Sequence, residues 1–323
     1  MLRPCLLLSL SLTLASLLPE VALGQAWLPP RGEGSVFLHY TGFYGGDHVF
    51  PNDSLDGQTT RGYTVDGDRL YMGDETSHLL TGGLEFGLHD RFAISGSLAW
   101  ITTNYDGRAP VNLAIDDGYW HPTFQDAAVG VRFMALKAPV VVTPFVRYAF
   151  PITDYESDGH AAQGRGLSTL TAGAAFGFSM SSLLRSTYFQ GRYGYGADEA
   201  VGDLEVRRSE LAVEVGTYAT NWLLLRFMGS FLTTHGGLPW ISEDPGRGCV
   251  HCPDATNLDA NQSDVRYARL GLGGSFRLGR RVSLFVAGFT TVEASNTIDA
   301  DFLMAGTRFF FKTPWARPSM FLD

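Results

Sequence analysis

The chain has 323 residues, of which 38 are glycine, 13% are aromatic and only 18% are charged, with a net charge of −9. Its mean hydropathy is close to zero, which is typical of strands in which apolar and polar side chains alternate. The acidic balance and the absence of a basic arm argue against nucleic acid as a partner.

Residues 1–24 have the pattern of a secretory signal peptide. Arg3 precedes an apolar run at 6–18, and the small residues Ala22 and Gly24 stand at the end, so we expect cleavage before Gln25. The apolar run is too short to span a membrane comfortably. We therefore expect an exported protein, either soluble or inserted as a β-barrel in the bacterial outer membrane.

After residue 33 the chain divides into about twelve alternating segments that are typical of β-strands. They are predicted at 33–50, 74–87, 92–105, 124–136, 140–153, 168–180, 186–198, 207–219, 223–236, 265–277, 281–296 and 300–313. The even number places both ends of the barrel on the same side of the membrane. Frequent glycines within these strands fit bends and crowded approaches in a curved sheet.

The links between the strands alternate in length. Short links are expected at 88–91, 137–139, 181–185, 220–222 and 278–280, and long ones at about 51–73, 106–123, 154–167, 197–206 and 237–264. Barrels of the bacterial outer membrane have short periplasmic turns and long outer loops. The sequence therefore predicts an all-β fold: a transmembrane antiparallel up-and-down β-barrel of about twelve strands, within residues 25–313.

Side chains along each strand should point alternately to lipid and to the lumen. In 207–220, for example, Leu211, Val213 and Val215 share one face, and Glu210 and Glu214 share the other. Carboxylates in lipid would be costly, so the second face must point inward. The same alternation predicts a lumen lined by Arg132, Arg147, Arg192, Glu210, Glu214, Arg226, Arg269, Arg277 and Arg308.

Two interpretations of these charges stay open. They could form a ladder of interior ion pairs that keeps a small barrel rigid, or a positively lined path that favours anionic solutes. Pro144 stands in the middle of a predicted strand and cannot donate a ladder hydrogen bond. We expect a bulge or a local gap at that position.

Cys249 and Cys252 lie in the longest link, with His251 between them. In an oxidising compartment a local disulfide is the first expectation. A metal site with His251 would lack a fourth ligand, and a redox role lacks the surrounding fold that such motifs use. No cofactor is expected, and no metal site is predicted elsewhere.

Two further stretches are distinctive. Asp116 and Asp117 precede a predicted strand and could bind calcium, or form a polar turn with an aromatic anchor. The stretch 150–165 combines Pro151 with aromatic residues, and we expect it to fold inward over the mouth. The histidines are scattered singly without a local catalytic signature, so an outer-membrane hydrolase is a minor alternative.

At these residues the chain resembles a known family. The start at 26–34, the segment from Asp116 to Asp126 and the Phe150-Pro151-x-x-Asp154-Tyr155 stretch resemble outer-membrane proteins grouped with transporters of the meta-pathway of phenol degradation. The resemblance implies a barrel for the uptake of small, often aromatic and hydrophobic compounds. It carries no defined set of binding residues.

The last strand reads Arg308-Phe309-Phe310-Phe311-Lys312, and a short periplasmic tail, 314–323, follows it. Barrels folded by the outer-membrane assembly machinery often end on an aromatic residue, so this tail is a departure. We expect a monomer in contact with outer-membrane lipid that passes small-molecule solutes passively. The alternative is a structural or surface-interaction barrel with a blocked lumen.

Overall fold

The computed structural model describes residues 26–51, 56–57, 59–60, 63–64, 66–107, 115–157, 159–180, 186–202, 204–238 and 263–316. The expected signal peptide 1–24, Cys249 and Cys252, and the tail beyond 316 lie outside these residues. No helix in the described part is long and apolar enough to cross a membrane.

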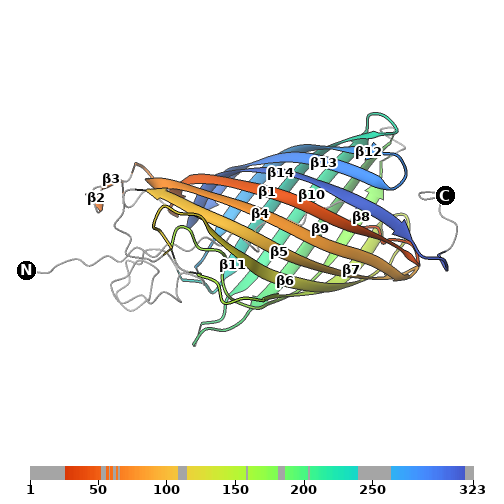
Figure 1. The fold of residues 1–323 in the computed structure, drawn as a ribbon, viewed down its shortest axis with the longest axis horizontal. Helices are drawn as coiled ribbons and strands as arrows, with labels where there is room; N and C mark the ends of the chain where they lie inside the picture. Colours follow the sequence, from red (N-terminus) through yellow and green to blue (C-terminus); the bar gives the residue numbers. More distant parts are fainter. Residues whose placement is uncertain are drawn as a thin grey trace, which may run out of the picture.

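Twelve long strands form a closed antiparallel barrel, which confirms the predicted fold class (Figure 1). They are β1 (Glu33–Val49), β4 (Arg69–His89), β5 (Phe92–Gly107), β6 (His121–Phe133), β7 (Val141–Pro151), β8 (Thr169–Ser179), β9 (Thr187–Asp198), β10 (Arg207–Tyr218), β11 (Leu223–His235), β12 (Arg266–Leu278), β13 (Val282–Ser295) and β14 (Thr297–Lys312). The short pair β2 (Thr59–Thr60) and β3 (Tyr63–Thr64) lies in the first long link.

The barrel closes where β1 pairs with β14, and Glu33 stands opposite Lys312. Both ends of the barrel sequence therefore lie at one end of the molecule, which we call the inner end. The short turns are at this end. The long links are at the opposite, outer end, where the single residue Asn296 between β13 and β14 makes the one short connection among the described links.

The two faces of the strands separate as the alternation predicts. On β6, Val129 and Val131 are 53% and 41% exposed on the outside, whereas Arg132 points inward to Glu85. On β12, Leu270 and Leu272 face outward and Arg269 is buried inside. An apolar band on the outside and polar side chains within are the pattern of an outer-membrane barrel.

Strand ends differ from the prediction by a few residues. The largest difference is at the start of β4 and has a physical cause. β4 begins at Arg69, five residues before the predicted start, because β1 continues past a bulge between Gly45 and Asp47 and pairs with it down to Arg69. On β7, the ladder to β6 ends at Phe145 and resumes only as an isolated bridge between Leu136 and Val142, with the register shifted by one. The irregularity expected at Pro144 is therefore present on this side of β7, while pairing to β8 is continuous.

Glycines make room for inward aromatic rings. A Cβ at Gly83 would lie 2.3 Å from the ring of Phe37, and one at Gly216 would lie 2.3 Å from the ring of Tyr188. In both cases the ring belongs to the directly opposite residue of the neighbouring strand. Large rings can thus lie flat against the wall instead of filling the lumen.

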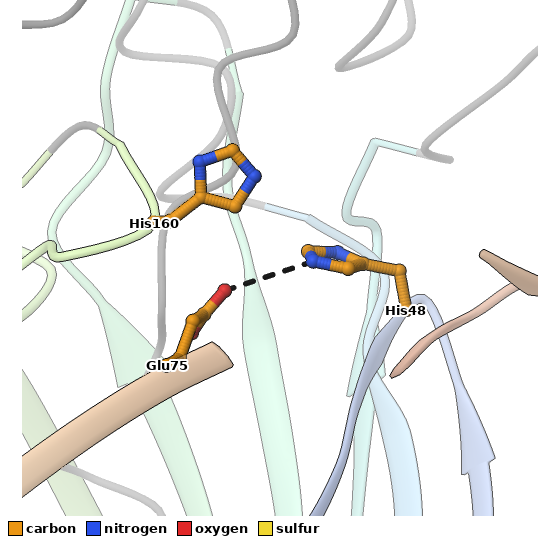
Figure 2. A group of neighbouring side chains, drawn as sticks. All are labelled: His48, Glu75 and His160. Carbon is orange, nitrogen blue, oxygen red and sulfur yellow. Dashed lines mark ion pairs between the residues drawn. The ribbon is translucent and has the colours of Figure 1, made fainter. Parts of the chain in front are cut away.

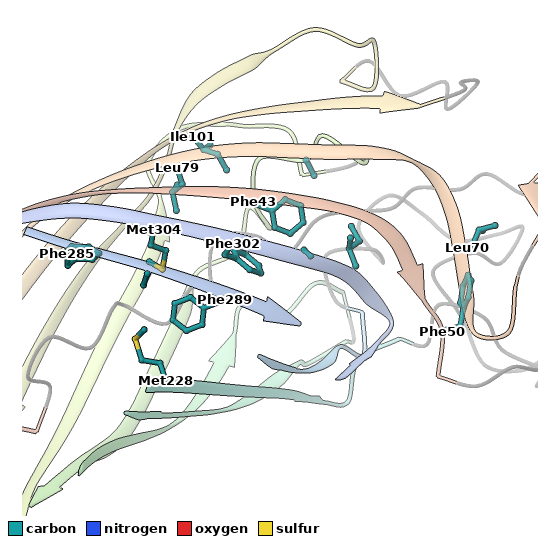
Figure 3. Packing of buried hydrophobic residues seen from close by; sticks show 14 residues of the cluster. Phe43, Phe50, Leu70, Leu79, Ile101, Met228, Phe285, Phe289, Phe302 and Met304 are labelled. Atoms are coloured by element: carbon teal, nitrogen blue, oxygen red, sulfur yellow. The ribbon is translucent and has the colours of Figure 1, made fainter. Parts of the chain in front are cut away.

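An apolar cluster fills one side of the outer half of the barrel (Figure 3). Its main members are Phe43, Phe50, Leu70, Leu79, Ile101, Met228, Phe285, Phe289, Phe302 and Met304. Most come from β1, β4, β5, β13 and β14, so the interior of this barrel is apolar on one wall. The other wall carries Arg132 on β6, Arg147 on β7, Arg165 in the link after β7 and Arg192 on β9.

Candidate functional site

The lumen contains a central cavity of about 150 Å³ between the two unlike walls. Phe37, Leu79 and Phe285 belong to its apolar side. Its charged lining consists of Arg132, Arg147, Arg165, Arg192, Arg308, Glu85, Asp126 and Glu210. Five guanidinium groups against three carboxyl groups leave an excess of positive charge around this space.

The charges of the cavity wall are partly paired. Glu85 forms ion pairs with Arg132 and with Arg308, the latter at 3.7 Å. Arg192 lies 4.4 Å above the ring of Phe145, and Arg308 lies 5.5 Å from the ring of Phe37. Guanidinium groups over aromatic faces keep their positive charge without needing a carboxylate partner.

The outer end of the cavity is narrowed by the segment between β7 and β8. Residues 159–165 are buried inside the barrel, and Ala162 belongs to the apolar cluster. Main-chain carbonyls of the segment accept hydrogen bonds from the wall: Thr103 donates to Ala161, and Gln125 donates to Gln163. The segment therefore folds into the mouth, in agreement with the sequence prediction for 150–165.

A buried network of charges anchors this segment. Arg165 and Arg208 both donate to Asp198, at 2.5 and 2.6 Å, and Thr169 donates to the other oxygen of Asp198 at 2.7 Å. The side chains of all three charged residues are at most 4% exposed. One carboxylate thus holds two guanidinium groups, which is a stable arrangement only while all partners are present.

Tyr155 holds the start of the same segment. Its hydroxyl donates to Asp126 at 2.5 Å and accepts a hydrogen bond from the amide of Gly166. Burial and the neighbouring Asp126 carboxylate raise the pKa of Tyr155 far above its usual value. The hydroxyl therefore remains a proton donor at any physiological pH.

The inner end of the lumen is narrowed by residues 26–32, which precede β1. Ala26 is fully buried, and its carbonyl accepts a hydrogen bond from Thr143 on β7 at 2.7 Å. The ring of Trp27 meets Tyr188 on β9 edge to face, with centroids 5.8 Å apart. The segment therefore crosses from the start of β1 to the opposite wall.

A second buried network supports that wall. Glu214 accepts hydrogen bonds from Tyr188 and, at 3.1 Å, from Gln190, and it pairs with Arg226 at 3.6 Å. Arg226 in turn donates to Ser275 at 2.6 Å. These five residues connect β9, β10, β11 and β12 within the wall, and we call them the brace.

The nine residues predicted to line the lumen have different surroundings. Arg132, Arg147, Arg192, Glu210 and Arg308 border the central cavity. Glu214 and Arg226 belong to the brace just described. Arg269 lies between the rings of Tyr267 and Phe302, at 3.8 and 4.2 Å. Arg277 is exposed near the end of β12, and its Nε donates to the carbonyl of Gly279.

Three residues of the outer buried network, Arg165, Asp198 and Arg208, were missed in the sequence. Arg208 has the same strand parity as Glu210 and Glu214, so the alternation could have indicated it. Arg165 stands in a link without periodicity, and no local pattern points to its position. The predicted acidic pair also separates: Asp117 caps Tyr119 and contacts His121 at the surface, whereas Asp116 turns inward to His160.

The amide of Tyr119 and the ring of His121 lower the pKa of Asp117. Asp117 is thus a charged surface cap, and the polar-turn interpretation of this stretch fits it. Asp116 instead accepts hydrogen bonds from the amide and ring of His160 and from the amide of Ala161. The two carboxylates do not converge on one position, as a shared calcium site would require.

The fold is similar to solved outer-membrane proteins. The COG4313 outer membrane channel from Pseudomonas putida F1 superimposes with a TM-score of 0.62 at 12% identity, covering 90% of this chain and all of that one. A NanC porin gives 0.48 at 9% identity, covering 84% of this chain and 98% of the porin. No protein-family description and no curated protein sequence matches the chain. The structural neighbours are thus outer-membrane barrels, and none of these comparisons tests the resemblance to phenol-pathway transporters.

Proposed function

We propose that the protein is a monomeric outer-membrane channel through which small solutes pass passively, with a preference for anions that carry an apolar part. The observation that supports this most is the central cavity, in which Arg132, Arg147, Arg165 and Arg192 lie on one wall, and Phe37, Leu79 and Phe285 lie with Arg308 on the other. Rings of arginine favour anions in pores. An apolar wall opposite them favours a solute with a hydrocarbon face.

The size of the cavity limits the solute. A cavity of about 150 Å³ accommodates a molecule the size of benzene. A single aromatic ring with a carboxylate would place its charge near the arginines and its ring near Phe37 and Phe285. Such aromatic carboxylates belong to the small aromatic compounds whose uptake the family resemblance implies. The arginines add a preference for a negative charge on the solute.

The first experiment is single-channel recording of the refolded protein in a planar bilayer, with the reversal potential measured across a salt gradient. We expect anion selectivity that falls in Arg192→Gln and rises in Glu85→Gln, because these changes remove opposite charges from the cavity wall. Arg207→Gln is the matched control, since Arg207 is exposed at the outer end and does not line the cavity. Equal selectivity in all three variants would contradict the proposal.

Solute class is tested in the same bilayers with ions of matched shape. Benzoate and benzylammonium each carry one ring and differ in charge, and we expect the channel to pass benzoate more readily. A preference for benzylammonium would refute the proposed class of solute.

A second candidate function is a barrel that is closed in its resting state and acts through its outer loops. The inward segments 26–32 and 159–165 favour it, because they occupy both ends of the lumen. Absence of conductance from a protein verified as folded would support this alternative. Neither candidate assigns the chain a catalytic role or a cofactor.

A further inference from the structure

Three buried side chains converge where the inward segment meets the wall of the barrel (Figure 2). They are His48 near the end of β1, Glu75 on β4 and His160 in the link between β7 and β8, and each is 1% exposed. One ligand atom from each lies within 4.8 Å of the other two, and Nε2 of His48 is 3.7 Å from Oε1 of Glu75. The three residues are distant in sequence, and only the folded barrel brings them together.

A bulge turns His48 toward the others. Before Gly45, even-numbered residues of β1 such as Leu38 and Tyr44 face outward. The register to β14 shifts between Gly45 and Asp47, so one extra residue stands in β1 there. One extra residue reverses the alternation, and His48 points inward opposite the buried Ile298. Bulges commonly re-aim side chains at functional sites.

His160 is oriented in the manner of a metal ligand. Its Nδ1 is 2.9 Å from Oδ2 of Asp116, and an ionised carboxylate can only accept, so Nδ1 carries the proton. In the neutral imidazole this leaves Nε2 with a lone pair, and Nε2 is buried with no hydrogen-bond partner among the described residues. A carboxylate that fixes the tautomer of a ligating histidine is the usual second partner of zinc sites. Tyr105 stacks on the ring of His160, with centroids 4.1 Å apart.

The charge balance also calls for a cation. Glu75 and Asp116 are both buried, and within the described part of the chain their ion pairs are with histidines, not with lysine or arginine. Neither oxygen of Glu75 has a hydrogen-bond partner among those residues. Two buried carboxylates are costly unless positive charge accompanies them. A divalent cation would supply it at the point where the three ligands meet.

The donor set indicates which cation. Two imidazoles and one carboxylate are the ligands of zinc sites that keep a fourth position open. In a tetrahedral site with bonds of about 2.0–2.1 Å, ligand atoms stand about 3.3 Å apart. The separation of 3.7 Å between His48 and Glu75 is close to this, and the ligand atom of His160, within 4.8 Å of both, would have to move closer for all three to bind one ion.

We propose that His48, Glu75 and His160 bind a transition-metal ion of the Zn²⁺ class. The ion would link residues 159–165 to β1 and β4. Asp116 is a positioning residue that holds His160 for the metal. The ion thereby stabilises closure of the outer end of the lumen. This inference does not depend on the solute or on conductance, because metal binding is measured on its own.

The test is titration of the metal-free, untagged, refolded barrel with Zn²⁺ by calorimetry. It is performed in a Cys249→Ser, Cys252→Ser background, because these thiols and His251 could bind zinc in a separate link. We expect one ion per barrel, lost in His48→Gln, Glu75→Gln and His160→Gln. Asp116→Asn should weaken binding by about 10–100-fold. His121→Gln is the matched control, since His121 pairs with Asp117 at the surface and should leave binding unchanged.

Absence of stoichiometric binding to a barrel verified as folded by its heat-modifiable mobility would overturn the proposal. So would binding that survives in His160→Gln or is lost in His121→Gln. X-ray absorption of the zinc-loaded barrel gives a measurement without these ligand variants, and it should show two imidazoles and oxygen ligands. Trypsin tests whether the ion holds residues 159–165 in place. Cleavage after the buried Arg165 should be slower with Zn²⁺ than with a chelator, and equal rates would contradict this effect of the ion.

Discussion

The segments that narrow the two ends of the lumen are held in place by different contacts. At the outer end, residues 159–165 are held by buried charges, chiefly the contacts of Asp198 with Arg165 and Arg208 and of Asp116 with His160. At the inner end, residues 26–32 are held by hydrogen bonds to their main-chain groups, one of them donated by the Thr143 hydroxyl, and by one aromatic contact, between Trp27 and Tyr188. No buried ion pair joins the inner segment to the wall in the part of the chain that the structure describes.

This difference determines how each closure should respond. Breaking one member of a buried charge network leaves its partners uncompensated, so a single substitution has a large effect. Main-chain hydrogen bonds and ring contacts each contribute little, so the inner closure should loosen gradually. We therefore expect the outer segment of this barrel to be held firmly and the inner segment to detach at a lower free-energy cost.

The largest effect is expected for Asp198→Asn. It leaves Arg165 and Arg208 buried beside a neutral amide, and the free energy of unfolding should fall by about 3–5 kcal/mol. Denaturant unfolding of the lipid-reconstituted barrel measures this. Asp154→Asn is the control, because Asp154 is exposed in the link that contains Arg165 and has no ion pair with a described residue. Equal stability of the two variants would show that the network contributes little.

An intermediate effect is expected for Gly216→Ala at the inner end. The added Cβ would clash with the ring of Tyr188. The ring would have to move, and it would lose its edge-to-face contact with Trp27 and its hydrogen bond to Glu214. Overpacking of this kind costs about 1–3 kcal/mol. We expect lower stability together with a change in conductance, since the displaced ring enters the lumen.

Gly288→Ala is the matched control for that substitution. Gly288 also lies within a strand, but a Cβ there meets only one atom, at 3.8 Å, which is an ordinary contact. If both glycine variants lose the same stability, displacement of the Tyr188 ring would not account for the effect.

The barrel wall was largely predictable from sequence, whereas the closures were only partly so. The segment 207–219 was predicted within a residue of β10 because its alternation is regular. His48 defeats the same reasoning, since a bulge at the glycine pair Gly45-Gly46 reverses the alternation; that pair was the available signal. The contact between Thr143 and Ala26 joins residues 117 apart in sequence, and no local pattern encodes it.

The smallest effect, and the most specific to the inner end, is expected for Thr143→Val. The change keeps the shape of the side chain and removes the hydrogen bond to the carbonyl of Ala26, which contributes about 1 kcal/mol. A loss of this size raises the ratio of barrels with residues 26–32 detached to barrels with them attached about fivefold. Single-channel recordings should therefore show a higher fraction of time in the larger conductance, with little change in unfolding.

Thr217→Val provides the comparison for this last prediction. Thr217 shares a hydrogen bond with Thr187 between β10 and β9, so its loss weakens the wall by a similar amount without touching residues 26–32. Only Thr143→Val should change the open fraction. If both variants change the open fraction equally, flexibility of the barrel wall, and not release of residues 26–32, determines the conductance at the inner end. The two ends would then differ less than their contacts indicate.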